Sequence, residues 1–282
     1  MFMYINDIPF FSKGSGGSAG LSEQDKQNII EIADKISADK IKQLLEHNIV
    51  ALEIPDGTTT ISNYQFQNNT DLRKVFAPES LETIGDNAFS GCFRMTGIDG
   101  LKGVKEIGTG AFENCYSLTD IEFPETLETI NGSAFKNCCS LSNKDLILPN
   151  CKTIQMSAFQ GCRFTGKLDL RKCTKIELDA FQGSNFSSIV FSSSLTSCDG
   201  SYRNPLSFTS LEFVDLGTNF NCNNFSLTSS TLYSIDTLVG VLNSLKDRTG
   251  ETAYTFMLGA TNLAKLTDEQ KAIATNKNWI LK

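Results

Sequence analysis

The sequence predicts an α/β repeat solenoid built around a parallel β-sheet. Two observations predict it: a nine-residue block that recurs at nearly constant spacing, and a short alternating apolar segment between successive blocks. The composition is a third, because the 282 residues include 20 Phe but only six Tyr and one Trp. This excess of Phe over the other aromatic residues indicates that one structural position recurs along the chain and requires Phe.

The N-terminal segment is predicted to hold an arm and a cap. Residues 1–21 combine an apolar arm, MFMYINDIPFF, with a Gly/Ser linker. Residues 22–48 carry apolar side chains at helical spacing behind Ser22, a suitable N-cap. Since an open solenoid end exposes core, we expect these residues to form a helical N-terminal cap.

Residues 49–220 are predicted to form the solenoid. The block Ile-x-x-x-Ala-Phe-x-x-Cys occurs at residues 84–92, 107–115, 130–138 and 154–162, with weaker copies at 61–69 and 176–184. Its Phe stands at positions 66, 89, 112, 135, 159 and 181, so the intervals by subtraction are 23, 23, 23, 24 and 22. A repeat of this length indicates one structural coil per copy.

Each coil is predicted to contribute one strand. Between the blocks lie pairs of apolar residues two positions apart, which is typical of a strand with one buried face. A single short strand must pair with the equivalent strand of the next coil, in parallel. The eight strands are expected to centre on Leu52, Val75, Ile98, Ile121, Leu146, Leu168, Ile189 and Val214.

The block residues are predicted to fill the interior of each coil. Cys92, Cys115, Cys138 and Cys162 recur at one inward position, where Cys acts as a small hydrophobe. The chain has nine Cys, an odd number, which favours free buried thiols over a disulfide framework. Parallel thiols do not converge on a metal ion, so no metal and no cofactor is expected.

Residues 221–282 are predicted to form a small α/β C-terminal cap. Residues 234–248 have the pattern of an amphipathic helix that stops before Gly250. Residues 255–258 have the pattern of a strand. Thr267 with Gln270 forms a capping-box pattern for a second helix, and residues 279–281 are a candidate closing strand.

The stretch LTDIEFPETLETINGSAFKNC, residues 118–138, resembles the BspA-like (bacterial surface antigen) class of leucine-rich repeat. The resemblance covers roughly residues 49–217. It weakens at residues 94–103, where Gly-Leu-Lys-Gly replaces a Pro turn, and after Leu195. It implies a leucine-rich-repeat right-handed superhelix used for adhesion or protein binding without catalysis. It also implies an origin in phages or prophages as one source of such proteins.

Several function classes are disfavoured. The net charge is −7, so the basic stripe that a nucleic-acid partner requires is missing. No run of 18 apolar residues exists, so no membrane insertion is expected, and the N-terminus lacks the basic region of a signal peptide. The single His, His47, falls at the end of the first predicted helix, where it serves better as a helix-end charge than as a catalytic base. We therefore predict that the chain is not an enzyme.

The outward face of the predicted sheet is the candidate partner-binding surface. The residue between two inward positions points outward. Five of the eight residues at that position are acidic, and the neighbouring row adds Lys74, Asp120, Asp145, Lys167 and Phe213. The eight are Glu53, Phe76, Asp99, Glu122, Ile147, Asp169, Val190 and Asp215. Two interpretations stay open: a solvated acidic face, or a face for a cationic protein or a polar glycan with apolar anchors.

Two functions compete. The first is a binding module for protein or glycan recognition and adhesion at a bacterial surface, which places the chain outside the cell. The second is a phage or prophage tail or head fibre protein for host attachment. Residues 1–12 would then anchor it to a virion assembly partner, although the arm could equally have no role.

Overall fold

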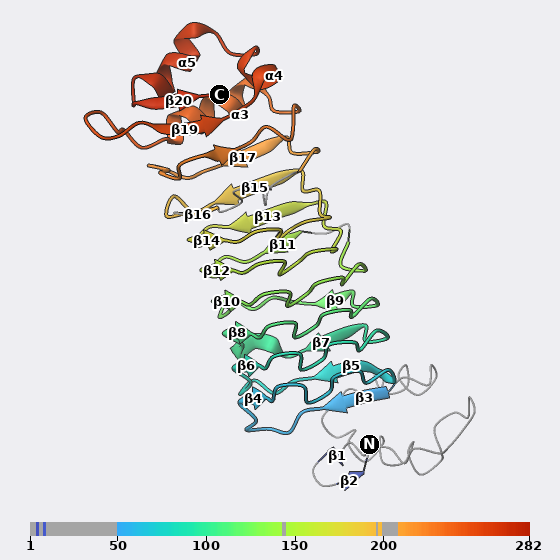
Figure 1. The fold of residues 1–282 in the computed structure, drawn as a ribbon. Helices are drawn as coiled ribbons and strands as arrows, with labels where there is room; N and C mark the ends of the chain where they lie inside the picture. Colours follow the sequence, from blue (N-terminus) through green and yellow to red (C-terminus); the bar gives the residue numbers. More distant parts are fainter. Residues whose placement is uncertain (1–3, 6–7, 10–49, 143–144, 196, 199–207) are drawn as a thin grey trace.

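The computed structural model describes residues 4–5, 8–9, 50–142, 145–195, 197–198 and 208–282. Most of the predicted N-terminal arm, the predicted helical cap and His47 lie outside them. Within the arm, β1 (Tyr4–Ile5) and β2 (Ile8–Pro9) pair antiparallel. From β3 onward the chain is a stack of coils that ends in an α/β unit (Figure 1).

The eight predicted strands are present and their pairing is parallel, which confirms the predicted architecture. They are β3 (Val50–Glu53), β5 (Leu72–Phe76), β7 (Gly97–Asp99), β9 (Asp120–Ile121), β11 (Leu146–Ile147), β13 (Lys167–Leu170), β15 (Ser188–Phe191) and β17 (Phe213–Asp215). We call this column the first sheet. It is hydrogen-bonded in two parts, β3-β5-β7-β9 and β11-β13-β15-β17.

The break between the two parts coincides with a change of spacing in the sequence. From the repeat Cys to the next inward strand residue there are six positions at Cys115–Ile121 and at Cys162–Leu168, but eight at Cys138–Leu146. The ladder is thus interrupted between β9 and β11, where the repeat is two residues longer.

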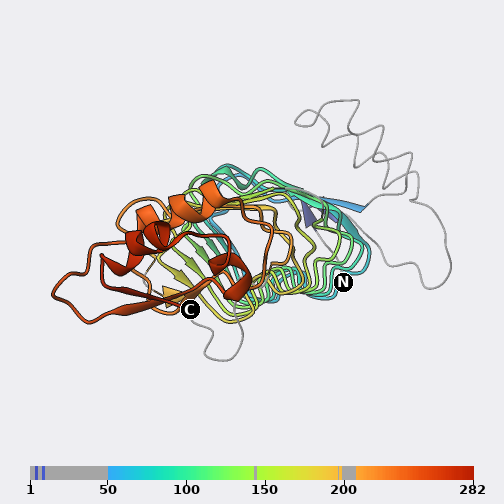
Figure 2. The same cartoon turned by 90° about the horizontal axis from the view of Figure 1, so that it is seen from above.

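A second sheet of seven parallel strands was not predicted. Its strands have two residues each, and are β4 (Thr60–Ile61), β6 (Thr83–Ile84), β8 (Glu106–Ile107), β10 (Thr129–Ile130), β12 (Thr153–Ile154), β14 (Lys175–Ile176) and β16 (Ser197–Cys198). Figure 1 shows the two columns of strands on two sides of the stack, and Figure 2 shows the coils overlying one another along its axis. Two residues are too few to display an alternating pattern, so only the block's buried Ile marks the first six of these strands.

The repeat block forms a tight turn with two left-handed residues in every coil. One stands before the Ala and one before the Cys, as at Asn87 (φ 52°) and Gly91 (φ 75°), or at Ser133 (φ 56°) and Asn137 (φ 63°). Gly and Asn tolerate this conformation best, which explains their recurrence here. The alternation directs N–H groups toward the next coil, as in Phe112 N to Ala134 O at 2.7 Å.

The block's Phe and Cys form two ladders through the core, as predicted. Adjacent rings stack with centroids 5.1 Å apart for Phe112 and Phe135, and 5.2 Å apart for Phe135 and Phe159. Each ladder thiol donates to a Phe carbonyl of the previous coil, as from Cys138 Sγ to Phe112 O at 3.1 Å. The described cysteines are all free. Burial raises the pKa of Cys92 to about 12 and that of Cys138 well above its usual range.

The coil that contains β7 departs from the other coils within residues 94–103, where the resemblance to the repeat family weakens. After β7 the chain forms a 3-10 turn, η2 (Leu101–Gly103), preceded by Gly100 with φ of 86°. A Cβ at Gly100 would lie 2.1 Å from the Ala77 carbonyl oxygen. Glycine is therefore required here by both conformation and space.

The C-terminal unit contains the four predicted elements, which are α3 (Ile235–Ser244), β19 (Tyr254–Met257), α5 (Asp268–Thr275) and β20 (Trp279–Leu281). It also contains β18 (Phe225–Ser226) and α4 (Ala260–Leu263), which were not predicted. The parallel order is β18-β19-β20, and Thr267 and Gln270 form the predicted capping box. Helix α3 ends before the predicted residue 248, because Leu245 leaves it to pair with Phe220.

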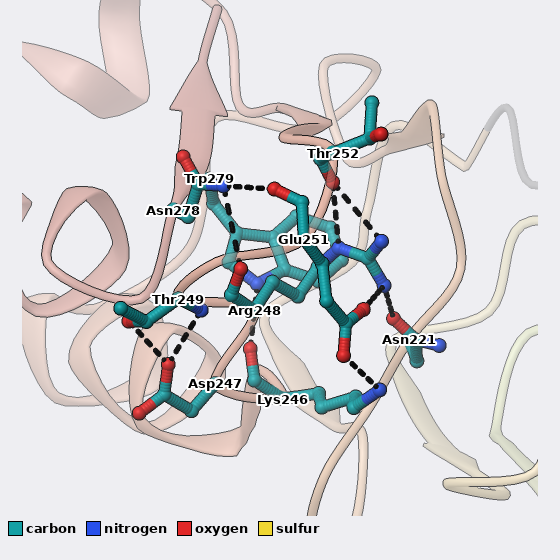
Figure 3. Close-up of polar contacts among 9 residues, drawn as sticks. All are labelled: Asn221, Lys246, Asp247, Arg248, Thr249, Glu251, Thr252, Asn278 and Trp279. Atoms are coloured by element: carbon teal, nitrogen blue, oxygen red, sulfur yellow. Dashed lines mark hydrogen bonds and ion pairs between the residues drawn. The ribbon is translucent and has the colours of Figure 1, made fainter.

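A cluster around Arg248 fixes the loop before β19 (Figure 3). Arg248 is buried, lies 3.4 Å from the Tyr254 ring centroid, and donates to Thr252 O and to Asn221 Oδ1. Its guanidinium also pairs with Glu251 at 3.1 Å. Next to it, Lys277 accepts a backbone hydrogen bond from Arg248 at 3.0 Å, and Lys277 Nζ donates to three carbonyls at the end of α3. That this unit is a cap, and the four-part division of the chain, remain predictions.

Candidate binding surface on the first sheet

The eight candidate residues form one row along the outward face of the first sheet, which we call the outer row. In the N-terminal part Glu53, Phe76 and Asp99 are direct register partners. In the C-terminal part Ile147, Asp169, Val190 and Asp215 are register partners in that order. Glu122 directly follows β9, beside the break in the sheet.

The residues two positions earlier on each strand form a second outward row, which we call the flanking row. Lys74, Gly97 and Asp120 are register partners, and so are Lys167, Ser188 and Phe213. The Asp145 side chain accepts a hydrogen bond from the Lys167 backbone at 2.7 Å. The structure therefore brings the predicted residues together in two strips separated at β9 and β11.

The expectation of a uniformly solvated acidic face is wrong for Asp169. This residue is only 3% exposed, because Lys167 and Arg171 lie on either side of it and both reach its Oδ2 at 3.0 Å. Its other carboxylate oxygen, Oδ1, is buried with no hydrogen-bond partner. Arg171 was not among the predicted surface residues. Its position beside Asp169 could have been predicted from the sequence, because residues 167, 169 and 171 lie on the same face of a strand.

A second carboxylate of the outer row is also neutralised. Asp99 Oδ1 lies 2.8 Å from Lys74 Nζ, and the Lys74 side chain is only 10% exposed. The flanking residues Ala51 and Gly97 are small and buried, which leaves room for the Lys74 stem against the sheet. The exposed acids of the outer row are thus Glu122 and Asp215.

Two large apolar side chains remain exposed on this face. Ile147 in the outer row is 41% exposed, and Phe213 in the flanking row is 49% exposed. Phe76 and Val190, the other predicted anchors, are partly buried. The C-terminal strip therefore offers apolar contacts at both ends, with the ion-paired Asp169 between them.

No metal-binding cluster accompanies this surface in the part of the chain that the structure describes. No group of three or more His, Cys, Asp or Glu residues there could hold a metal ion. Of the helices in the same residues, none has the length and apolar character to cross a membrane.

Comparison with known proteins identifies the family. The model of the BspA type leucine rich repeat region matches in six copies, over residues 42–165 and 152–245. The match spans more than half of the chain, so the chain belongs to this leucine-rich-repeat family. No curated protein sequence matches it.

Several solved structures are similar. A leucine rich repeat protein of T. pallidum is 18% identical, with 83% of this chain and 86% of that chain covered and a TM-score of 0.42. A leucine rich cell surface protein from Faecalibacterium prausnitzii is 14% identical over 82% and 87% of the two chains, with a TM-score of 0.37. A leucine-rich repeat protein from Bacteroides ovatus is 20% identical over 67% and 64%, with a TM-score of 0.38.

Proposed function

We propose that the chain is a non-enzymatic binding module that recognises a protein or glycan receptor through the outward face of the first sheet, at a bacterial surface. The observation that carries the proposal is the C-terminal strip, where Ile147 on β11 and Phe213 on β17 remain exposed at the two ends of four strands paired in register. Repeat solenoids present such faces as extended binding surfaces. Exposed apolar groups among charges are typical of interaction sites.

The exposed carboxylates define the preferred partner. Glu122 and Asp215 flank the apolar residues, while Asp99 and Asp169 already hold basic side chains of the same chain. A partner that meets this face with scattered basic groups gains attraction at the two exposed acids. Such contacts act mainly on the association rate and weaken with salt.

The test is charge reversal at the exposed acids. Glu122→Lys and Asp215→Lys are combined and binding to whole bacterial cells is measured at low and high salt. Glu125→Lys, an exposed acid outside both rows, is the matched control. We expect weaker binding at low salt for the double variant alone. Unchanged binding at both salt concentrations would contradict the charge contribution.

The alternative function is a phage or prophage fibre protein anchored by residues 1–12. It is favoured by the apolar character of the arm and the Gly/Ser segment behind it. Deleting residues 1–12 should leave the solenoid folded, because the described core lies in residues 52–279, but should abolish incorporation into a larger assembly. Normal assembly of the truncated protein would contradict this alternative.

A further inference from the structure

A groove lies on the edge of the coils, between the repeat block and the first sheet. Its volume is about 550 Å³, and its lining comes from four successive coils. The lining residues are Tyr116, Asn137, Cys139, Gly161, Arg163 and Gly183. Each of these stands directly before or directly after the last residue of a repeat block, so the groove runs along the axis of the stack.

Two glycines make the hollow. The residue before the last residue of each block has a left-handed conformation. In the third and fourth copies of the block this residue is Asn114 and Asn137, and Asn137 Nδ2 donates a hydrogen bond to Asn114 Oδ1 at 2.8 Å. The next two coils have Gly161 and Gly183 there instead. The ladder of amide side chains therefore ends at Asn137, and no side chain follows it at Gly161 or Gly183.

An unpaired cation lies beside this hollow. Elsewhere on the coils, lysines pair with a glutamate of the previous coil, as in Lys136–Glu113 and Lys152–Glu128. The residue one coil before Arg163 is Cys139, so no glutamate stands at the corresponding position there. In the described residues no carboxylate pairs with the exposed Arg163 guanidinium, so its donors are available to a ligand.

The other walls supply an aromatic face and an acceptor. Tyr116 is 47% exposed, and its hydroxyl donates to Asn114 Oδ1 at 3.3 Å, which orients the ring. Asn137 Oδ1 is directed over Gly161, because a Cβ placed there would lie 2.8 Å from it. An aromatic face, a guanidinium and an amide oxygen together match a ring that has one apolar face, hydroxyl groups and an anionic substituent.

We propose that this groove binds an acidic glycan, a chain of pyranose rings that bear carboxylates. Arg163 would pair with a carboxylate, Tyr116 would pack on the apolar face of one ring, and Asn137 Oδ1 would accept from a hydroxyl. An extended peptide fits less well, because its rise of about 3.3 Å per residue does not match coils about 4.8 Å apart. A pyranose is close to one coil in length. The inference goes beyond the proposed sheet surface, since it assigns a second site with its own ligand class.

The experiment uses two matched probes and the full chain. Affinity is measured by calorimetry for glucuronate-containing hexasaccharides and for the same compounds with their carboxylates reduced to alcohols. Gly161→Asn continues the amide ladder and fills the hollow, and Gly91→Asn makes the same change at the same position of a coil outside the groove. Arg163→Gln removes the cation, with the exposed Arg94→Gln as its control. Melting temperatures establish that each variant is folded.

We expect Arg163→Gln to weaken binding of the carboxylated probe about 10- to 100-fold, without weakening binding of the reduced one. Gly161→Asn should weaken binding of both, while both controls stay within about twofold of the unmodified protein. Three results would overturn the proposal: no binding of the carboxylated probes, equal affinity for the reduced probes, or tighter binding of an oligoglutamate peptide. Ile147→Asp should leave glycan binding unchanged, so failure of the sheet-face proposal would be recognised separately.

Discussion

The central coils and the C-terminal unit are stabilised in different ways. In the coils one contact is repeated: Phe rings stack on identical rings at 5.1 to 5.6 Å, and each ladder thiol donates to a carbonyl of the coil before. The C-terminal unit instead combines contacts that each occur once: an apolar core that includes Phe256 and Trp279, and polar contacts made by Arg248 and Lys277. A repeated contact can be predicted from spacing, whereas a unique contact must be observed.

The largest effect is expected from removing one ring of the Phe ladder. Phe135→Ala should lower the free energy of unfolding by about 3–5 kcal/mol, because coils on both sides prevent the cavity from collapsing. The measurement is denaturant unfolding, with Phe93→Ala as the control, since Phe93 is 40% exposed. An unchanged melting temperature for Phe135→Ala would contradict the assignment of Phe135 to the core.

The next effect concerns the C-terminal unit alone. Arg248→Met retains much of the side-chain volume but leaves Thr252 O and Asn221 Oδ1 without their donor, at a cost of about 2–3 kcal/mol. Because the contacts are local, hydrogen exchange should accelerate in residues 245–282 and not in the coils. Uniform acceleration along the whole chain would show that the two regions unfold together.

A pH effect should arise from the buried thiols of the coils, both in the Cys ladder and at Cys151 and Cys173. Burial raises the pKa of Cys92, Cys151 and Cys173 to about 12, whereas an unfolded thiol titrates near about 8.5. The unfolded chain therefore loses these protons first. Stability is complete below about pH 8.5 and falls, as pH rises toward 12, by up to about 1.4 kcal/mol per pH unit and thiol.

The thiol prediction is checked by urea unfolding between pH 7 and pH 10. Cys173→Ala should show a smaller loss of stability over this range than the unmodified protein, because one shifted group has been removed. The same slope for both proteins would mean that Cys173 contributes nothing to it.

The smallest effect is expected at the cap of α5. Thr267→Ala removes the side-chain acceptor of the Gln270 N–H and should cost about 1 kcal/mol. Ser229→Ala, a partly buried residue outside the helices, is the control, and thermal unfolding is the measurement. Equal melting temperatures for Thr267→Ala and the unmodified protein would show that the capping box adds no stability.

The predictable part of the molecule is the part that repeats. The spacing of Phe and Cys predicts the coil, the buried ladder and all eight strands of the first sheet, since each copy confirms the others. The second sheet was missed because two residues such as Thr83 and Ile84 carry no period. The break at β9 was missed because it coincides with a single departure from the repeat, two additional residues after Cys138.

The alignment of the candidate residues could be predicted from the sequence, but the ion pairs around their carboxylates could not. Alternation on a strand predicts that Asp169 faces outward, and the register pairs align it with Ile147 and Val190. Its burial depends on Arg171 and Lys167 reaching the same oxygen, which is a matter of side-chain conformation. The groove at Arg163 depends likewise on two glycines that interrupt an amide ladder, and the ladder itself is visible only in three dimensions.

The most direct test of the central claim, that the first sheet presents the binding surface, is the loss of its exposed apolar side chains. Ile147→Asp and Phe213→Asp are combined and binding to whole bacterial cells is compared with Met156→Asp, where an equally exposed side chain lies outside the first sheet. We predict binding at least about tenfold weaker for the double variant, since apolar anchors dominate such interfaces, and no change for Met156→Asp. Equal binding by all three folded proteins would contradict the claim.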